Sequence, residues 1–358
     1  MAKGAKAAAA DIEPVLLPLA DGGAGTVRAM VAATGGRLMT TETHGPLGGI
    51  VQAAWGILGD TTTAVIEMSA ASGLSLVPGD KLDPLAASTF GTGELIAAAM
   101  EAGCRRIIIG LGDSATVDGG AGMAQALGIG LLDAAGQPVK PGGGGLSRLA
   151  CIDMSGRHPL IADCEILCAS DVTNPLYGEN GAAYIYGPQK GATPDMVRQL
   201  DASLRHFAGV VERKLGIDIA RVPGAGAAGG LGAGLVVFLG AEIRSGIELV
   251  CDIIGFDAYL DDADLVLTGE GRIDFQTAFG KTAVGIAGRA KTKGKPVIAL
   301  CGELGPGYRD VYGHGIDAAL SIIPGCMDRK EAMQQAGRLL EEATESIVRI
   351  FILSASRG

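Results

Sequence analysis

Aromatic residues, histidines and long apolar runs are all scarce in this sequence, and each shortage excludes a class of protein. Aromatic residues make up only 4% of the chain, so few rings are available to stack the bases of single-stranded nucleic acid. The net charge of −10 also argues against nucleic acid or an anionic membrane as a partner. Charges or glycines interrupt every long apolar stretch, which predicts that no helix spans a membrane.

The cysteines and histidines favour neither a disulfide framework nor a zinc site. Seven cysteines are scattered along the chain, an odd number that predicts reduced thiols and hence a cytoplasmic protein. The four histidines do not lie at the spacing of zinc ligands. The first residues are mostly alanine and lysine and lack the apolar core of a secretory signal.

Glycine is present in excess, with 58 residues, roughly twice the usual share. The glycines follow no period and lie among apolar segments, which excludes collagen and disorder and predicts many tight loops. Apolar residues make up 48% of the chain and charged residues 19%, the composition of a soluble globular protein. A chain of 358 residues is long enough for two domains or one large one.

Short apolar runs alternate with glycine-rich loops and helical patterns along the chain. The runs that predict strands lie at residues 14–19, 63–68, 106–110, 165–169, 265–268, 296–301 and 318–323. The helical patterns include residues 89–103, 193–215 and 328–352. This alternation predicts an α/β protein with a mainly parallel sheet. The segment 40–58, which alternates polar and apolar residues, predicts antiparallel β structure instead.

The densest group of chemically active residues lies at 268–282, directly after an apolar run. Its glycines would let backbone N–H groups approach an oxyanion, and Lys281 adds a positive charge. Glu270 and Asp274 could hold a divalent cation or accept a proton. Because open α/β sheets bind ligands at the carboxyl ends of their strands, this group indicates a phosphoryl-transfer or anion-binding site. An ordinary glycine-rich loop between a strand and a helix is the alternative interpretation.

Four further clusters have the same form, with glycines and polar residues at the end of an apolar run. They lie at residues 18–26, 110–122, 171–192 and 223–232. Asp171 ends an apolar run and is a candidate functional carboxylate, although a lone aspartate there is also a common helix cap or turn residue. Lys190, taken alone, is typical of a solvated surface charge.

Two of these clusters resemble the dinucleotide-binding fingerprint. Gly110, Gly112 and Ala115 follow a predicted strand with the required spacing, and Asp133 lies where an acid that binds ribose would be expected. Further glycines would, however, interrupt the helix that should follow. The second match, at residues 224–229, lacks a convincing strand before it. A dinucleotide-dependent oxidoreductase is therefore a weaker alternative.

Taken in order, the clusters resemble the type I glycerate kinase family over nearly the whole chain. The matching segments are Ala20-Asp21-Gly22-Gly23, Gly45-Pro46-Leu47-Gly48, residues 67–74, 91–96, 114–116, 118–123, 171–176, 187–192 and 224–232, and Thr268-Gly269-Glu270-Gly271 with Asp274, Gln276, Thr277, Gly280 and Lys281. Each motif alone is weakly specific, whereas their common order is highly specific.

The resemblance implies a two-domain α/β protein with its active site in the cleft between the domains. A Rossmann-like three-layer α/β/α domain with a mainly parallel sheet would comprise residues 1–40 and 258–358, and a mixed α/β domain at 41–257 would be inserted in it. The implied reaction transfers the γ-phosphoryl group of ATP to D-glycerate with Mg²⁺, usually giving 2-phosphoglycerate. Such a transfer needs mainly positioning and charge neutralisation from the protein, which glycine-rich loops, lysines and carboxylates provide.

Applied residue by residue, the same resemblance implies an active site that draws on many parts of the chain. The expected catalytic residues are Asp171, Asp274, Lys281 and Glu270. The metal ligands among them would be Asp171 and Glu270, and Asp171 or Asp274 would be the base. The residues expected to bind substrate or nucleotide are Asp21, Gly22, Gly23, Ser114, Thr116, Asp118, Gly119, Gly120, Thr173, Asn174, Gln189, Lys190, Gly269, Arg272, Gln276 and Thr277.

The chain departs from the family pattern at four places. Family members usually begin with a strand that ends in a Pro-Asp-Ser-Phe-Lys-Gly-like segment, and this strand is expected to be missing before Asp21. Ala24 replaces the usual glutamate, and Asp113 and Val117 alter a Gly-Gly-Ser-Ala-Thr-Asn-Asp segment. Asp113 would repel phosphate if it pointed inward, and a sheet without one strand would expose an edge for association with a second copy of the chain. A catalytically silent relative that binds metabolites or regulates is the alternative function.

Overall fold

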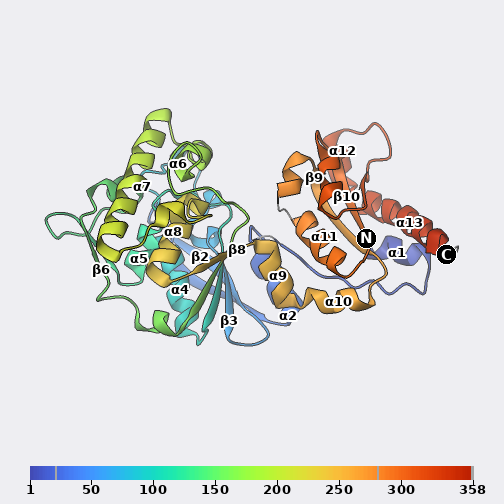
Figure 1. Ribbon diagram of the computed structural model, residues 1–358, viewed down its shortest axis with the longest axis horizontal. Helices are drawn as coiled ribbons and strands as arrows, with labels where there is room; N and C mark the ends of the chain where they lie inside the picture. Colours follow the sequence, from blue (N-terminus) through green and yellow to red (C-terminus); the bar gives the residue numbers. More distant parts are fainter. Residues whose placement is uncertain (21, 280–281, 356–358) are drawn as a thin grey trace. The chain divides into compact units, whose positions relative to one another are not determined.

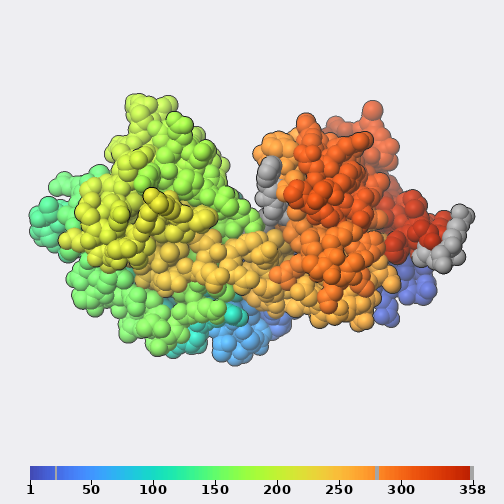
Figure 2. All heavy atoms as spheres, in the orientation of Figure 1, coloured from blue at the N-terminus to red at the C-terminus, as the bar shows by residue number. Residues whose placement is uncertain are grey.

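The computed structural model describes residues 1–20, 22–279 and 282–355, and the chain divides into two compact units. The terminal unit joins both ends of the chain, Met1–Pro18 and Cys251–Gly358, and the inserted unit is the continuous segment Leu19–Val250 (Figure 1). Figure 2 shows all heavy atoms as spheres, and the orange and red residues of the C-terminal part lie in the terminal unit. Each unit has its own sheet.

The boundaries between the two units lie after Pro18 and after Val250. The sequence predicted these boundaries after residues 40 and 257. The helix α2 (Thr26–Thr34) accounts for the first difference, because it packs against the sheet of the inserted unit. A Cβ on Gly56 of that sheet would lie 2.3 Å from a methyl carbon of Val31. The second division falls within the helix α9 (Gly246–Ile254).

The inserted unit contains a six-stranded sheet with the strand order β1-β2-β3-β4-β7-β8. Its strands are β1 (Arg37–His44), β2 (Ile50–Ile57), β3 (Thr63–Glu67), β4 (Arg106–Gly110), β7 (Glu165–Ala169) and β8 (Glu242–Arg244). From β3 to β8 all pairs are parallel, while β1 and β2 form an antiparallel hairpin that joins β3. The predicted α/β class with a mainly parallel sheet, and the antiparallel structure predicted at 40–58, are both confirmed.

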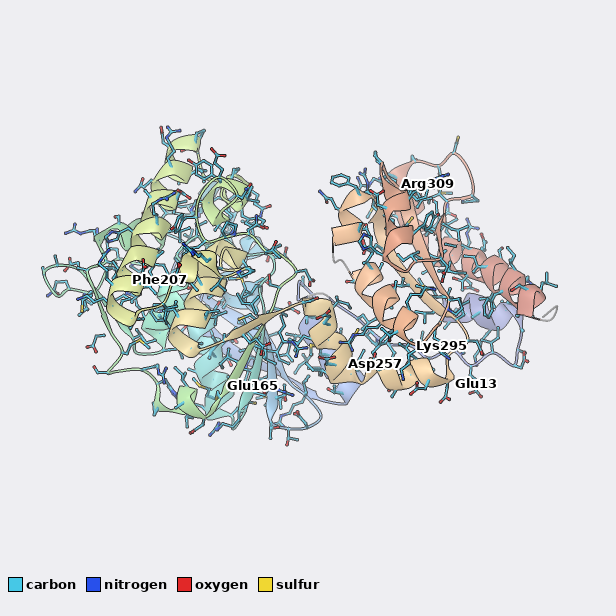
Figure 3. All side chains as sticks on the ribbon, viewed as in Figure 1. Glu13, Glu165, Phe207, Asp257, Lys295 and Arg309 are labelled. Atoms are coloured by element: carbon cyan, nitrogen blue, oxygen red, sulfur yellow. The ribbon has the colours of Figure 1, made fainter. Side chains whose placement is uncertain are left out.

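Helices bury both faces of this sheet, which explains why its central strands are continuously apolar. The helices besides α2 and α9 are α3 (Ser69–Ser72), α4 (Phe90–Glu101), α5 (Ala121–Ala126), α6 (Ala182–Tyr186), α7 (Pro194–Leu215) and α8 (Ala227–Leu239), and a small second sheet pairs β5 (Gly130–Leu132) with β6 (Cys151–Asp153). Ile107 and Ile109 of β4 belong to the main core, and Ile108 between them is buried on the other face. Phe207 of α7, labelled in Figure 3, packs against Phe238 of α8 with 6.1 Å between ring centroids.

The terminal unit contains a three-stranded parallel sheet with the order β11-β10-β9. Its elements are α1 (Ala2–Ala8), α10 (Phe256–Asp262), β9 (Val266–Ile273), α11 (Thr282–Thr292), β10 (Val297–Leu304), β11 (Ala318–Ser321), α12 (Arg329–Gln334) and α13 (Ala336–Ala355). The first helix packs closely on the last, since a Cβ on Gly4 would lie 2.1 Å from the carbonyl oxygen of Glu341. Both ends of the chain therefore contribute to one core.

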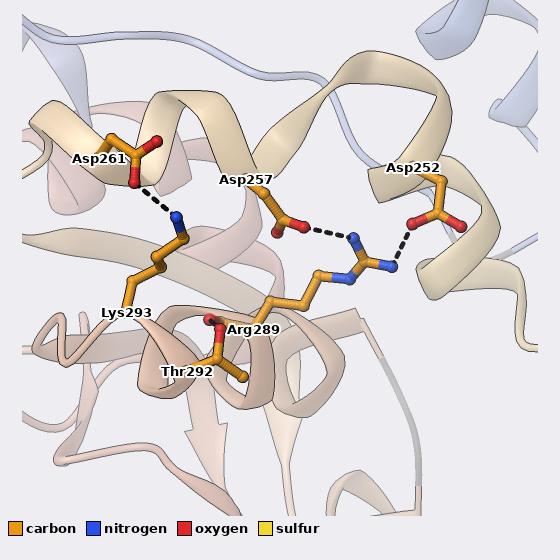
Figure 4. A network of polar contacts seen from close by, with 6 residues as sticks. All are labelled: Asp252, Asp257, Asp261, Arg289, Thr292 and Lys293. Carbon is orange, nitrogen blue, oxygen red and sulfur yellow. Dashed lines mark hydrogen bonds and ion pairs between the residues drawn. The ribbon is translucent and has the colours of Figure 1, made fainter.

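Ion pairs link the helices α9, α10 and α11 within the terminal unit (Figure 4). Arg289 of α11 lies 2.5 Å from a carboxylate oxygen of Asp252 on α9 and 3.3 Å from one of Asp257 on α10. Lys293 lies 2.6 Å from Asp261 at the end of α10. One arginine thus fixes two helices on a third.

Three predicted elements differ from the structure. Residues 14–19, predicted as a strand, have no regular structure, because Pro14 and Pro18 each remove a backbone donor. The helical pattern at 328–352 is divided at Gln335 into α12 and α13. The strand predicted at 265–268 continues as β9 to Ile273. Within the described residues, no helix combines the length and the apolar character needed to cross a membrane.

Candidate functional site

In the inserted unit, two predicted glycine clusters meet at the carboxyl ends of β4 and β7. A Cβ on Gly110, the last residue of β4, would lie 2.2 Å from the carbonyl oxygen of Gly22. A Cβ on Gly112 would lie 2.8 Å from the Cα atom of Gly23, and one on Gly22 would lie 2.8 Å from the carbonyl oxygen of Ala169. These backbones approach so closely that side chains would not fit between them. Asp21, predicted beside them, lies outside the described residues.

The segment that follows β4, residues 111–120, is called the β4 loop below. It is fastened at several points to other parts of the inserted unit. The N–H of Ala115 donates to the carbonyl oxygen of Ser72 (2.9 Å), and the N–H of Gly119 donates to the carbonyl oxygen of Gly229 (3.1 Å). Lys190 donates from Nζ to the hydroxyl of Ser114 and the carbonyl oxygen of Thr116, each at 2.7 Å. The predicted residues Ser114, Thr116, Gly119 and Lys190 are therefore brought together.

The carboxylate of Asp118 is the buried centre of the β4 loop. It is fully buried and accepts four hydrogen bonds, from the N–H and hydroxyl groups of Thr89 and from the N–H groups of Gly120 and Gly122, at 2.8 to 3.1 Å. Burial raises the pKa of Asp118 above its ordinary value, and these hydrogen bonds act in the opposite direction. Asp118 was predicted to bind substrate or nucleotide; as a fully buried carboxylate that accepts four hydrogen bonds from the protein, it shapes the loop.

Lys190 is buried rather than solvated. Only 1% of its surface is exposed, so the interpretation of this residue as an ordinary surface charge is wrong. Burial lowers the pKa of Lys190 to about 7, while the charge of Asp118 acts in the opposite direction. The fold holds this side chain at a substantial electrostatic penalty.

This penalty predicts a specific dependence of stability on pH. The folded pKa of Lys190 is about 7 and the ordinary value is 10.5, so the unfolded chain binds more protons between these two values. The penalty is therefore complete below pH 7 and is lost as the pH rises toward 10.5. We therefore compare the free energy of unfolding of Lys190→Met with that of the original protein at each pH. We expect this difference, variant minus original, to be more positive at pH 6 than at pH 9. Urea denaturation at both pH values measures this difference, and an equal difference at both would contradict the expectation.

Asp171 lies just after β7 and caps the helix α9. Its Oδ1 atom accepts hydrogen bonds from the hydroxyl of Ser245 (2.8 Å) and from the N–H of Gly246 (2.9 Å). The helix N-terminus and the carboxylate stabilise one another. Ser245 and β8 were not predicted, although a serine directly before a helical pattern is a known N-terminal signal.

The other predicted residues of this region lie near Asp171 in the sequence but have different surroundings. Asn174 is held within its own segment, because its Oδ1 accepts from the hydroxyl of Tyr186 (2.7 Å) and its Nδ2 donates to the carbonyl oxygen of Asn180 (2.9 Å). Thr173 and Gln189 are exposed. Among these residues Asp171 thus has the clearest structural setting at a strand end.

In the terminal unit, Glu270, Arg272, Asp274 and Thr277 form one polar group at the end of β9. The hydroxyl of Thr277 lies 3.5 Å from Glu270 Oε2, and the N–H of Asp274 donates to that hydroxyl at 3.2 Å. Arg272 Nε lies 3.1 Å from Asp274 Oδ2. The N–H of Ala283, in the first turn of α11, donates to Glu270 Oε1 at 3.4 Å. The fold therefore collects two carboxylates, a hydroxyl and a guanidinium.

The backbone around this group is a strand rather than the predicted loop. Glu270 pairs with Cys301 of β10, and Arg272 pairs with Glu303, so Gly269 lies inside β9. The polar side chains consequently project from a sheet and are held by its ladder. Gln276 is exposed just after the strand, and Lys281 lies outside the described residues.

The carboxylates at Asp171, and at Glu270 and Asp274, provide oxygen ligands of the kind that a hard cation such as Mg²⁺ prefers. Among the described residues, no three histidine, cysteine, aspartate or glutamate side chains gather closely enough to form a metal cluster by themselves. Mg²⁺ commonly takes only one or two protein carboxylates and completes its shell with water and phosphate oxygens. Asp171 in one unit, and Glu270 with Asp274 in the other, are carboxylates of that kind.

Comparison with known proteins identifies the family of this chain. A sequence model described as the glycerate kinase family matches residues 1–352. The chain belongs to the glycerate kinase family. Relatives in this family include a glycerate kinase from Halalkalibacterium halodurans, 54% identical over 93% of this chain and 87% of the relative. A glycerate 2-kinase from Escherichia coli is 52% identical over 91% of this chain and 86% of the relative.

A solved structure of a glycerate kinase relative has the same fold. It is the crystal structure of a protein described as glycerate kinase 2 from Salmonella typhimurium LT2. The match covers 99% of this chain and 93% of the solved chain, with a TM-score of 0.88 and 46% sequence identity. Membership of the glycerate kinase family explains the shared order of the glycine clusters and leaves no support for the oxidoreductase alternative.

Proposed function

We propose that this protein transfers the γ-phosphoryl group of ATP to D-glycerate in the presence of Mg²⁺ and releases 2-phosphoglycerate. The observation that carries the proposal is the 54% identity to a glycerate kinase over 93% of this chain. The product is proposed because a relative of 52% identity is a glycerate 2-kinase. The polar groups at the strand ends of both units are consistent with phosphoryl transfer, which depends on positioning and on charge neutralisation.

Both units contain residues that we expect to act in phosphoryl transfer. In the inserted unit, the glycine-rich backbone around Gly22 and the β4 loop is the proposed anion site. In the terminal unit, Arg272 and the carboxylates of Glu270 and Asp274 extend from the end of β9. Asp21 and Lys281 remain expected members of the site.

Asp171 and Glu270 are the proposed protein ligands of Mg²⁺. Asp171 follows the carboxyl end of the parallel strand β7, and Glu270 lies in the C-terminal half of the parallel strand β9. When bound with ATP, Mg²⁺ neutralises charge on the phosphate oxygens. The proteinʼs own task is then to orient the glycerate hydroxyl and to accept its proton.

Asp171 and Asp274 are the two candidates for the base that accepts this proton. Each has one oxygen fixed by the backbone, since Asp171 accepts from Gly246 (2.9 Å) and Asp274 from Gln276 (2.9 Å). A fixed carboxylate is a useful base because it does not have to be ordered during the reaction.

The first test measures ADP release from ATP with D-glycerate, Mg²⁺ and the purified protein, with L-glycerate as control. Addition of enolase detects 2-phosphoglycerate selectively, because enolase dehydrates this isomer and not 3-phosphoglycerate. Turnover specific for D-glycerate with an enolase signal supports the proposal. Binding of ATP and glycerate in a calorimeter without ADP formation would instead support the catalytically silent relative, for which the departures at Asp113 and Val117 argue.

We expect Asp171→Asn or Asp274→Asn to lower kcat by about 100-fold or more, whichever residue is the base. Asn keeps an oxygen that can accept from Gly246 or Gln276, so the local structure should survive. Ser245→Ala is the matched control for Asp171, because it removes a hydrogen bond to the same carboxylate and leaves the charge. A variant that retains the original kcat excludes its residue as the base.

A further inference from the structure

Lys190 is buried at a place where the neighbouring chain is exposed. It ends the 3₁₀ turn Pro188–Lys190, between the exposed residues Gln189 and Gly191. Only 1% of Lys190 is exposed, and it is one of the largest fully buried side chains described. Burial of an ammonium group is unfavourable unless its hydrogen bonds are satisfied. The side chain must therefore have a use that outweighs this penalty.

The hydrogen-bond acceptors of the Lys190 ammonium group belong to the β4 loop. Its ammonium group donates to the hydroxyl of Ser114 and to the carbonyl oxygen of Thr116, each at 2.7 Å. The charge of Asp118, in the same loop, favours the protonated amine. Lys190 thus connects the segment after α6 with the loop after β4.

The conformation of the β4 loop is unfavourable by itself and needs stabilising contacts. Asp113 has a left-handed backbone with φ 56°, which is unfavourable for a residue other than glycine. Directly beside it, Gly112 approaches the backbone of Gly23 at the carboxyl ends of the strands. The exposed part of the loop therefore borders the proposed anion site, while Lys190 holds the buried part.

We propose that Lys190 is a positioning residue that holds the β4 loop through Ser114 and Thr116 and does not itself contact the substrate or ATP. This inference rests on the proposed kinase function and changes the role that the sequence predicted for Lys190. A ligand would reach the ammonium group only by displacing the loop, because the group is enclosed by the protein. Ser114, with 7% of its surface exposed, is the most exposed of the three residues in this connection.

A double-mutant cycle tests whether Lys190 acts through Ser114. The variants are Lys190→Met, Ser114→Ala and their combination, with the exposed Lys140→Met as matched control. We expect Lys190→Met to lower kcat/KM for D-glycerate by about tenfold to 100-fold, because a displaced loop misplaces the reacting groups. The double variant should be no worse than Lys190→Met, since both changes break one connection. Losses that multiply would show that Lys190 contacts the ligand independently and would overturn the proposal.

Hydrogen–deuterium exchange of the loop gives a test that does not depend on turnover. Peptides covering residues 111–122 should exchange faster in Lys190→Met and in Ser114→Ala than in the original protein or in Lys140→Met. Unchanged exchange in both variants would overturn the proposal. Should Lys190→Met not fold, Ser114→Ala alone decides, because it removes only a hydroxyl at the edge of the network. If the original protein shows no kinase activity, the proposed function fails, and the exchange measurement still decides the role of Lys190.

Discussion

Gly229→Ala is expected to destabilise the inserted unit by about 3 kcal/mol. Gly229 lies near the start of α8 with a left-handed backbone, φ +70°, and a Cβ on it would lie 1.9 Å from the carbonyl oxygen of Thr116. That oxygen already accepts the hydrogen bond of Lys190. No flexible side chain can yield there, so the β4 loop itself would have to shift. The substitution should consequently also lower kcat.

Gly240 provides a closely matched control for Gly229. Both glycines have φ 70° and ψ 28°, and Gly240 caps the other end of the same helix. A Cβ on Gly240 would have no heavy atom within 4 Å. Gly240→Ala should therefore cost only the left-handed strain, about 1 kcal/mol. Equal losses at both positions would show that contact with the β4 loop is unimportant.

Tryptophan fluorescence during urea denaturation is a suitable measurement for these variants. The chain has one tryptophan, Trp55, which lies in the core of the inserted unit with 1% exposure. Its signal therefore reports the unfolding of that unit alone. A changed midpoint at constant slope gives the change in stability.

Asp118→Asn is expected to destabilise the inserted unit by about 3 kcal/mol, as for other buried, hydrogen-bonded charges that lose their partners. Asp118 accepts four hydrogen bonds from N–H and hydroxyl donors. Asn replaces one acceptor oxygen with an NH₂ group, so two donors would face each other in a place that water does not reach. The N-terminal turns of α4 and α5, which these donors belong to or adjoin, should loosen together.

Asp60→Asn is the control for this second substitution. Asp60 also accepts several hydrogen bonds, from Thr62 N–H (3.0 Å) and from the N–H (2.9 Å) and hydroxyl (2.5 Å) of Thr63. It is exposed, so water can replace the lost acceptor, and the expected loss is below about 1 kcal/mol. Similar losses at the two aspartates would mean that burial does not set the effect.

The sequence predicted the sheets well where both faces are buried. The strands β3, β4 and β7 are short apolar runs in the sequence, because helices cover both sides of them. Residues 14–19 show the same apolar character without a strand, since apolar composition does not reveal whether a hydrogen-bonding partner exists. The strand β8, with three residues, and the following α9 carried too short a signal to be predicted.

The candidate site was predictable in its location but less so in its roles. Asp171 does follow the end of β7, as the apolar run before it indicated, whereas Glu270 lies within β9, which continues to Ile273. The burial of Lys190 was not predictable, because its neighbours Gln189 and Gly191 are exposed and only a loop distant in the sequence encloses it. Likewise, the four donors around Asp118 come from two different segments, and no local pattern brings them together.

The packing of α1 on α13 joins the first and the last helix of the chain within one unit. During synthesis on the ribosome, α1 emerges first, and the complete inserted unit follows it. Its partner α13 is translated only after the inserted unit, so α1 remains unpaired while that whole unit is being synthesised. An isolated helix of this length is unstable in water, and α1 should therefore order only after α13 has been synthesised. The terminal unit should thus complete its folding later than the inserted unit.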